Sequence, residues 1–217
     1  MKKPLIKYCG NSSQEDLEAS VSSNADYLGL IFADSKRRVE PENVQKWLEN
    51  IELGRKKLAA VFVNPALSEV KEVISKLPIS VIQCHGDEEP AFLVKLKEET
   101  GLEVWKAISS HEDVLKEMDR FQCAADGFVV DSKTKEAYGG TGKTFDWSIV
   151  REVTDHAGKN NKKCFIAGGL SPENVSELMK RGPEGLDLAS GIEDKGRKSK
   201  DKIKLFEEKV MNHDTTA

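Results

Sequence analysis

The sequence has no long hydrophobic run. In its 217 residues, no apolar stretch approaches the roughly 18 consecutive positions that a membrane-spanning helix needs. Lys2 and Lys3 are not followed by the apolar segment of a secretion signal, so we expect no signal peptide. The default expectation is a cytoplasmic protein.

Cysteine is scarce, and neither sign of charge dominates. The four cysteines, Cys9, Cys84, Cys123 and Cys164, are irregularly spaced, and none belongs to a CxxC pair. We therefore expect no disulfides, and the four histidines lack the ligand spacing of a zinc site. The formal net charge of −4 arises from mixed acids and bases, which gives no support for a nucleic-acid partner.

Eight short apolar runs of β character alternate with helix-like segments along the whole chain. Continuous apolar runs of this kind are typical of parallel strands that are covered on both faces. In the intervening segments, apolar residues recur at helical spacing, as at Ile203, Phe206 and Val210. The β-like runs cover residues 5–9, 27–32, 58–63, 80–84, 103–107, 127–130, 164–167 and 186–189.

Local signals predict where three of the helices begin. Ser12 and Glu15 have the spacing of a capping box. The pairs Asn64-Pro65 and Ser171-Pro172 each place a capping residue before a proline at the first helical position.

The strand–helix repeats predict an α/β fold with a parallel sheet. Eight repeats in a chain of this length favour one (β/α)8 barrel of the TIM type, with eight parallel strands, as a single domain over residues 1–217. An open, doubly wound sheet is the alternative, because periodicity does not reveal closure. The charged tract 193–202 is interpreted as a solvated loop, and 212–217 as a flexible tail.

A (β/α)8 barrel carries its functional site at the carboxyl ends of the strands. Cys9 ends the first run and Asp131 follows the sixth, so both are candidates for proton transfer. A cysteine base needs a lowered pKa, and an aspartic acid donor needs a raised one. Spacing alone favours simpler roles, a small buried thiol for Cys9 and a capping carboxylate for Asp131.

Glycines cluster after the last two runs. Gly168 and Gly169 follow the seventh run, and Ser190 and Gly191 follow the eighth. Because glycine lets backbone N–H groups approach an anion, these two loops predict a phosphate site. Tight turns without a ligand are the alternative.

The segment Gly139-Gly140-Thr141-Gly142-Lys143-Thr144 resembles a nucleotide-binding loop. It lacks the P-loop spacing of four residues between the first glycine and Gly-Lys-Ser/Thr, and no strand runs directly into it. We reject ATP binding and predict a mobile glycine-rich loop over the end of the sixth strand.

These motifs, taken together, resemble the phosphoribosylanthranilate isomerase family. The matches run in chain order over nearly the whole sequence, and their combination is far more specific than any one of them. They are Lys7-Tyr8-Cys9-Gly10, Gly29-Leu30-Ile31-Phe32 with Ser35-Lys36-Arg37, Val61-Phe62-Val63-Asn64, Ile82-Gln83-Cys84-His85-Gly86, Asp131 with Tyr138 to Trp147, Ala167-Gly168-Gly169-Leu170 with Pro172 to Val175, and Asp187 to Glu193.

Four residues depart from the family pattern: Tyr8, Asn11, Cys84 and Ala189. Tyr8 and Cys84 stand at strand positions and concern barrel packing. Asn11 lies next to Cys9 and bears on the shape of the site. Ala189 replaces a serine and removes one side-chain contact near the phosphate.

The resemblance implies an Amadori rearrangement by acid–base catalysis, with Asp131 as general acid and Cys9, as thiolate, as general base. It implies substrate contacts by Arg37, Gln83, His85 and Asp187, although His85 could equally support another residue and Asp187 could cap its own loop. Arg37 would pair with the anthranilate carboxylate. The implied phosphate-binding residues are Gly140, Gly142, Gly168, Gly169, Ser190 and Gly191.

This chemistry is internal redox by proton transfer, so the resemblance implies no cofactor and no metal. The expected partner is a small phosphosugar substrate, with no nucleic acid and no membrane. A monomer is favoured, and a homodimer is the alternative.

Two rival functions remain at this point. Another phosphosugar barrel enzyme would need either the lysine-centred set of indole-glycerol-phosphate synthase or the His/Asp metal cluster of an epimerase, and we find neither. A non-catalytic binding barrel is compatible with the fold, but it would not need Cys9, Asp131 and Arg37 together.

Overall fold

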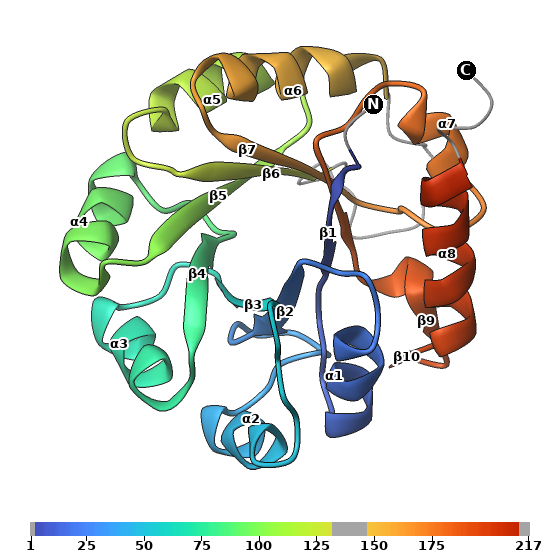
Figure 1. The fold of residues 1–217 in the computed structure, drawn as a ribbon. Coiled ribbons are helices and arrows are strands. Elements are labelled where there is room, and N and C mark those ends of the chain that lie inside the picture. The colour runs from blue at the N-terminus through green and yellow to red at the C-terminus, as the bar shows by residue number, and fades with distance from the viewer. Residues whose placement is uncertain (1–2, 132–146, 213–217) are drawn as a thin grey trace.

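The computed structural model describes residues 3–131 and 147–212, and in it eight parallel strands close into a barrel in chain order. Figure 1 shows the helices arranged in a ring outside these strands. The strands are β1 Leu5–Tyr8, β2 Tyr27–Ile31, β3 Lys57–Phe62, β4 Ile79–Cys84, β5 Glu103–Ser109, β6 Gly127–Asp131, β7 Lys163–Ala167 and β8 Gly185–Leu188. The predicted (β/α)8 barrel is confirmed, and the open sheet is wrong.

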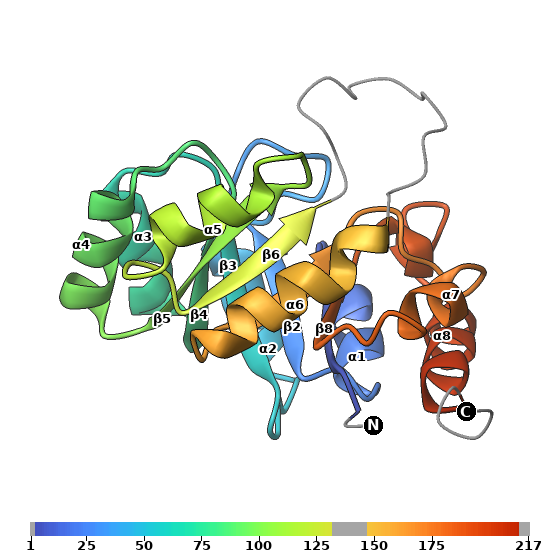
Figure 2. The ribbon, with the colours of Figure 1, turned by 90° about the horizontal axis from the view of Figure 1, so that it is seen from above.

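Eight α-helices of the described residues follow the strands and cover the barrel from outside (Figure 2). Within the described ranges, none of them is long and apolar enough to cross a bilayer. They are α1 Gln14–Val21, α2 Pro41–Leu48, α3 Leu67–Lys76, α4 Pro90–Thr100, α5 Val114–Phe121, α6 Val150–Lys159, α7 Val175–Met179 and α8 Lys200–Asn212, with short 3-10 helices η1 Trp147–Ile149 and η2 Ser190–Ile192.

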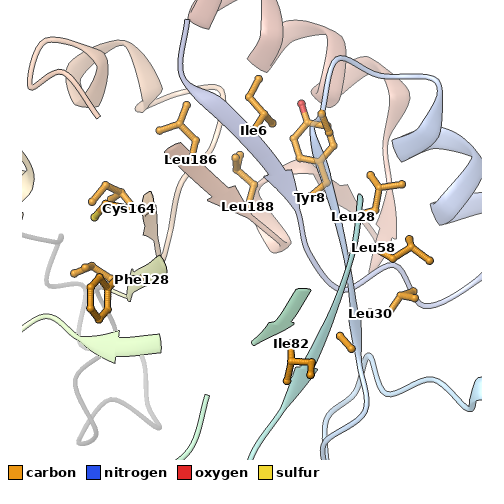
Figure 3. Close-up of a cluster of buried hydrophobic side chains, with 14 of the residues drawn as sticks. Ile6, Tyr8, Leu28, Leu30, Leu58, Ile82, Phe128, Cys164, Leu186 and Leu188 are labelled. Carbon is orange, nitrogen blue, oxygen red and sulfur yellow. The ribbon is translucent and has the colours of Figure 1, made fainter. Parts of the chain in front are cut away.

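Even-numbered side chains of the barrel strands form the core between strands and helices. Figure 3 shows part of this cluster, including Ile6 and Tyr8 of β1 and Leu188 of β8. The Tyr8 ring lies edge-on to Phe206 of α8 at 6.4 Å, and its hydroxyl bonds to Glu207 at 3.0 Å. The hydroxyl of Tyr8, which the family pattern lacks at this position, therefore has a hydrogen-bond partner on α8.

Odd-numbered side chains point into the barrel, and aromatic rings close its amino end. The rings of Tyr27 and Phe165 both pack against Trp105. In each pair the two ring centroids are 4.8 Å apart. Gly185 makes room for this layer, since a Cβ there would lie 2.7 Å from the Phe165 ring. The packed rings leave the carboxyl end as the open end of the barrel.

The predicted capping box at the start of α1 is wrong by one residue. The N-cap is Ser13, whose side chain accepts a hydrogen bond from the N–H of Asp16. Asp16 in turn accepts bonds from the N–H and hydroxyl of Ser12, at 3.1 and 3.0 Å. Asp16 thus reaches back to Ser12, one residue before the N-cap, so the two interactions do not form a reciprocal capping box.

The two predicted starts before proline are also wrong. Asn64 has a φ of 49°, which asparagine tolerates, and its side chain accepts a bond from the Asp87 N–H at 2.7 Å. It joins two loops instead of capping, and α3 begins after Ala66. Ser171 opens a turn, and the N-cap of α7 is Asn174.

The tract predicted to be a solvated loop contains a small antiparallel hairpin. It consists of β9 Glu193–Asp194 and β10 Arg197–Lys198. Glu193 and Lys198 are buried, at 8% and 9% exposure. The prediction fails because Glu193 pairs both with Lys198 across the hairpin and with the distant Arg37, so these charges need no solvent.

Candidate active site

Cys9 and Asp131 lie at the same end of the barrel. Cys9 directly follows β1, and Asp131 is the last residue of β6. Both continue the odd-numbered face that points inward. Cys9 is 9% exposed, and the Asp131 side chain is 17% exposed. In a closed parallel barrel, all carboxyl ends meet around one mouth, so the thiol and the carboxyl group belong to one site.

A buried ion pair lies beneath the thiol. Lys7 and Asp187 are register partners on β1 and β8, and the ammonium bonds to both carboxylate oxygens, at 2.9 and 3.1 Å. Burial raises the pKa of Cys9, while the charges of Lys7 and Lys198 oppose this and Asp187 adds to it; the net pKa lies above the ordinary range. The lowered pKa expected of a base is absent in the free protein.

Asp131 faces a histidine supported from the barrel interior. The Asp131 carboxylate lies 3.7 Å from Nε2 of His85, and Nδ1 of His85 lies 3.1 Å from the amide nitrogen of Gln83. A donating Gln83 amide leaves the ring proton on Nε2, toward Asp131. Burial lowers the pKa of His85 and outweighs the attraction of Asp131 and Asp187. Gln83 itself is buried, at 1% exposure.

Arg37 is held at the mouth by the hairpin. Its Nε and Nη2 bond to the two oxygens of Glu193 at 2.8 and 2.7 Å, and this hydrogen bonding raises the pKa of Arg37. Its stem crosses Gly10, where a Cβ would lie 2.5 Å from Cδ of Arg37. Lys198 also binds Glu193, at 3.0 Å, and donates to the carbonyls of Cys9 and Ala189 at 2.7 and 3.1 Å.

The two loops predicted to bind phosphate lie against each other. Gly168 and Gly169 have φ angles of 87° and 67°, which favour glycine. A Cβ on Gly191 would lie 2.9 Å from Cα of Ser171, so only glycine allows this approach. Asn174 braces the first loop by donating to the Gly169 carbonyl at 2.8 Å. Ser190 begins η2 beside them.

Some predicted site residues cannot be compared. Gly140 and Gly142, and the whole glycine-rich loop 139–144, lie outside the described residues. Among residues 3–131 and 147–212, no group of three or more His, Cys, Asp or Glu side chains is placed to hold a metal ion.

Sequence reasoning missed Lys7, Glu193 and Lys198. The signal for Lys7 was its position two residues before Cys9, which puts both on one face of a strand. Glu193 and Lys198 gave no signal, because the hairpin that pairs them is buried only through Arg37 and the Cys9 carbonyl, which are distant in the chain. Asn11, a departure from the family pattern, is fully buried and binds the carbonyls of Tyr8 and Gly29 at 3.0 and 3.1 Å, so it fixes the backbone beside the thiol.

Comparison with known proteins places this chain in a family. The family model for N-(5′-phosphoribosyl)anthranilate (PRA) isomerase matches residues 6–209, which is nearly the whole chain. The chain belongs to the phosphoribosylanthranilate isomerase family. The resemblance inferred from the motifs, and with it the classification as an enzyme, is confirmed.

Curated phosphoribosylanthranilate isomerases resemble the chain over their full length. The protein of Geobacillus thermodenitrificans is 46% identical over 208 residues, covering 96% of this chain and 94% of the relative. That of Bacillus subtilis is 46% identical over 213 residues, covering 98% of each.

Solved phosphoribosylanthranilate isomerases share the fold. The Thermotoga maritima structure aligns with a TM-score of 0.81 at 31% identity, covering 96% of this chain and 99% of that one. Another, solved in complex with reduced 1-(o-carboxyphenylamino)-1-deoxyribulose 5-phosphate, aligns with a TM-score of 0.78 at 28% identity, covering 96% and 99%.

Proposed function

We propose that this chain catalyses the Amadori rearrangement of N-(5′-phosphoribosyl)anthranilate to 1-(2-carboxyphenylamino)-1-deoxyribulose 5-phosphate in tryptophan biosynthesis. Membership of the family over residues 6–209 supports the reaction. The relative solved with a reduced deoxyribulose phosphate supports a phosphosugar as the ligand. The observation that carries the proposal is the position of Cys9 and Asp131 at one mouth of the barrel.

The first step is ring opening by Asp131 as general acid. Asp131 gives its proton to the ring oxygen of the ribose, the bond from C1 to that oxygen breaks, and the nitrogen lone pair forms a protonated Schiff base. His85, with Nε2 at 3.7 Å from Asp131, is close enough to orient this carboxyl group. The low pKa of His85 keeps its ring neutral near pH 7, so it does not draw the proton away.

The second step is removal of the C2 proton by Cys9. The thiolate takes the proton, the C2 electron pair forms an enolamine, and tautomerisation gives the ketone. Burial raises the pKa of Cys9 in the free protein. The Schiff base formed in the first step carries a positive charge, and a cation close to the sulfur favours the thiolate.

Arg37 is proposed to bind the anthranilate carboxylate. Glu193 occupies the edge formed by Nε and Nη2, which leaves the end formed by the two Nη groups to a second carboxylate. Gln83, His85 and Asp187 remain predicted substrate contacts. In this structure Gln83 supports His85, and Asp187 binds Lys7.

The phosphate is proposed to bind where the loops after β7 and β8 meet. Gly168, Gly169, Ser190 and Gly191 supply backbone that an anion can approach closely. The roles of Gly140 and Gly142 stay predictions.

Compartment and assembly also stay predictions. The free cysteines of the described residues, Cys9, Cys84, Cys123 and Cys164, support a reducing compartment such as the cytoplasm. A monomer is the expected state.

The test uses the purified protein and the aminoaldose, followed by the loss of anthranilate fluorescence. Cys9→Ala and Asp131→Asn should each lower kcat by on the order of 100-fold or more, as loss of a positioned acid or base does. The matched controls, Cys123→Ser and Asp155→Asn, change exposed side chains of the same types and should leave kcat unchanged. Near-normal turnover by a site variant would refute its assigned role.

A further inference from the structure

A lysine inside the barrel needs an explanation. The Lys7 side chain is fully buried, and its ammonium pairs with the Asp187 carboxylate of the neighbouring strand β8. Removing one partner of such a buried pair is strongly destabilising, whereas apolar residues of similar volume would often serve stability as well as the pair does. The presence of the pair formed by Lys7 and Asp187 is therefore weak evidence that it serves stability. Its position in the barrel indicates a role in the site.

That position is directly below the thiol. Lys7 and Cys9 are two residues apart on the inward face of β1, so their side chains project in the same direction. Gly29 of β2 leaves room for the sulfur, since a Cβ there would lie 2.7 Å from Sγ. The Cys9 backbone is fixed by its N–H bond to the Leu188 carbonyl at 2.7 Å. The sulfur is thus held in place above the ammonium.

The other charged groups near the sulfur are already engaged. Lys198 of β10 uses its ammonium on two carbonyls and on Glu193. Arg37, from the loop after β2, is paired with the same carboxylate. The carboxylate of Asp187 on β8, whose charge raises the pKa of Cys9, is bound to Lys7.

We propose that Lys7 is a positioning residue for the acid–base chemistry: its buried ammonium, held in place by Asp187, supplies the charge that favours the thiolate of Cys9. This inference rests on the proposed role of Cys9 as the base. Asp187 has two opposed effects, because it fixes the ammonium but also repels the thiolate.

The pKa values agree with this geometry. Burial raises the pKa of Cys9, and attraction to Lys7 is the largest effect that lowers it, ahead of the opposing effect of Asp187. Burial lowers the pKa of Lys7, but attraction to Asp187 and Cys9 outweighs it, so the pKa of Lys7 is raised. The raised pKa of Lys7 favours the charged ammonium beside the thiol.

The experiment follows thiolate absorbance in the ultraviolet as a function of pH, in the free protein carrying Cys123→Ser. The spectrum of the same protein with Cys9→Ser is subtracted. Burial also raises the pKa of both Cys84 and Cys164, to about 12. Because both thiols are present in the two proteins, the subtraction removes their contribution. The acid limb of kcat/KM is measured on the same samples.

Opposite shifts are expected from the two partners. Lys7→Gln should move the thiolate midpoint to higher pH and lower the thiolate fraction on the acid limb by about tenfold or more, as loss of a close opposite charge does. Asp187→Asn should move the midpoint to lower pH, since it removes a repelling anion. The acid limb of kcat/KM should follow in both variants. An unmoved midpoint in folded Lys7→Gln, with stability or kcat reduced equally at every pH, would mean a structural role and overturn the proposal.

A second variant covers a failure to fold. Lys7→Met combined with Asp187→Asn removes both charges and leaves no unpaired ion. Its midpoint should still move to higher pH, because the effect of Lys7 on Cys9 exceeds that of Asp187, and a midpoint equal to or below that of the parent would overturn the proposal. A shifted midpoint with an unshifted kcat/KM limb would support the charge effect but refute Cys9 as the base.

Discussion

Substituting Gly191 by alanine tests whether the two glycine loops form one anion site. The new Cβ would lie 2.8 Å from the carbonyl carbon of Leu170 and 2.9 Å from Cα of Ser171, and closer still to the Leu170 oxygen. All three atoms are backbone, so no side chain can rotate away. Ordinary contact begins at 3.4 Å, and the loops after β7 and β8 must therefore separate by on the order of 1 Å.

A separation of this size should weaken substrate and phosphate binding more than it lowers the free energy of unfolding. Overpacking typically lowers the free energy of unfolding by about 1–3 kcal/mol, whereas a 1 Å misplacement of a binding group can cost about 100-fold in rate. We expect kcat/KM for the aminoaldose to fall by about 100-fold, and competitive inhibition by inorganic phosphate to weaken in parallel. Circular dichroism on heating measures the loss of stability.

Alanine substitutions at two other glycines distinguish the effect of a steric clash from that of backbone strain. Gly169→Ala meets no atom within 4 Å but keeps a φ of 67°, so it should cost about 1–2 kcal/mol of strain in the same site. Gly158→Ala, in α6, meets no atom within 4 Å and has no positive φ, so it should raise stability by about 0.4–1 kcal/mol and leave binding unchanged. If Gly191→Ala stays folded and phosphate inhibits it as well as the parent, the anion does not bind where these loops meet.

Three other side chains give separate tests. Arg37→Lys should raise KM for the aminoaldose by about tenfold or more, because lysine lacks the planar fork; an aniline analogue without the carboxylate should not distinguish the two proteins. Burial raises the pKa of Glu193, but its two cationic partners outweigh this and lower it. Its folded pKa therefore lies below the unfolded one, so the stability it adds is present above about pH 4.3 and is lost on acidification; the Tm advantage over Glu193→Gln should shrink as the pH falls below that value. The His85 ring should titrate by NMR below the ordinary histidine value, since burial lowers its pKa, and Asp131→Asn should lower that pKa further by removing an attraction.

The sequence was sufficient for the order and extent of the strands and favoured a barrel, although closure itself came from the structure. Apolar runs mark strands that are covered on both faces, so all eight strands could be predicted to within a residue or two. Once the strands were located, the rule that a barrel opens at the carboxyl ends brought Cys9 and Asp131 to one mouth. The position of the site therefore follows from the apolar pattern of the strands and from the rule that a barrel opens at their carboxyl ends.

The remaining features depend on pairs that are distant in the chain. A run of charges in 193–202 indicates solvent unless Arg37, more than 150 positions earlier, is known to meet Glu193. Lys7 looks like an exposed lysine until its register with Asp187 is known. Asn64 looks like a cap until the loop that its side chain binds is in place. A short stretch of sequence around each of these residues does not include the distant residue that it contacts.

During synthesis, β1 leaves the ribosome long before the segments that complete it. One edge of this strand pairs with β8, and the carbonyl of Cys9, directly after the strand, is bound by Lys198 of the hairpin. In a nascent chain that ends before residue 185, that edge of β1 is therefore unpaired and can pair with strands of other chains. Binding by a chaperone would prevent such aggregation. Catalytic competence would then arrive late and abruptly, when the end of the chain docks against its beginning.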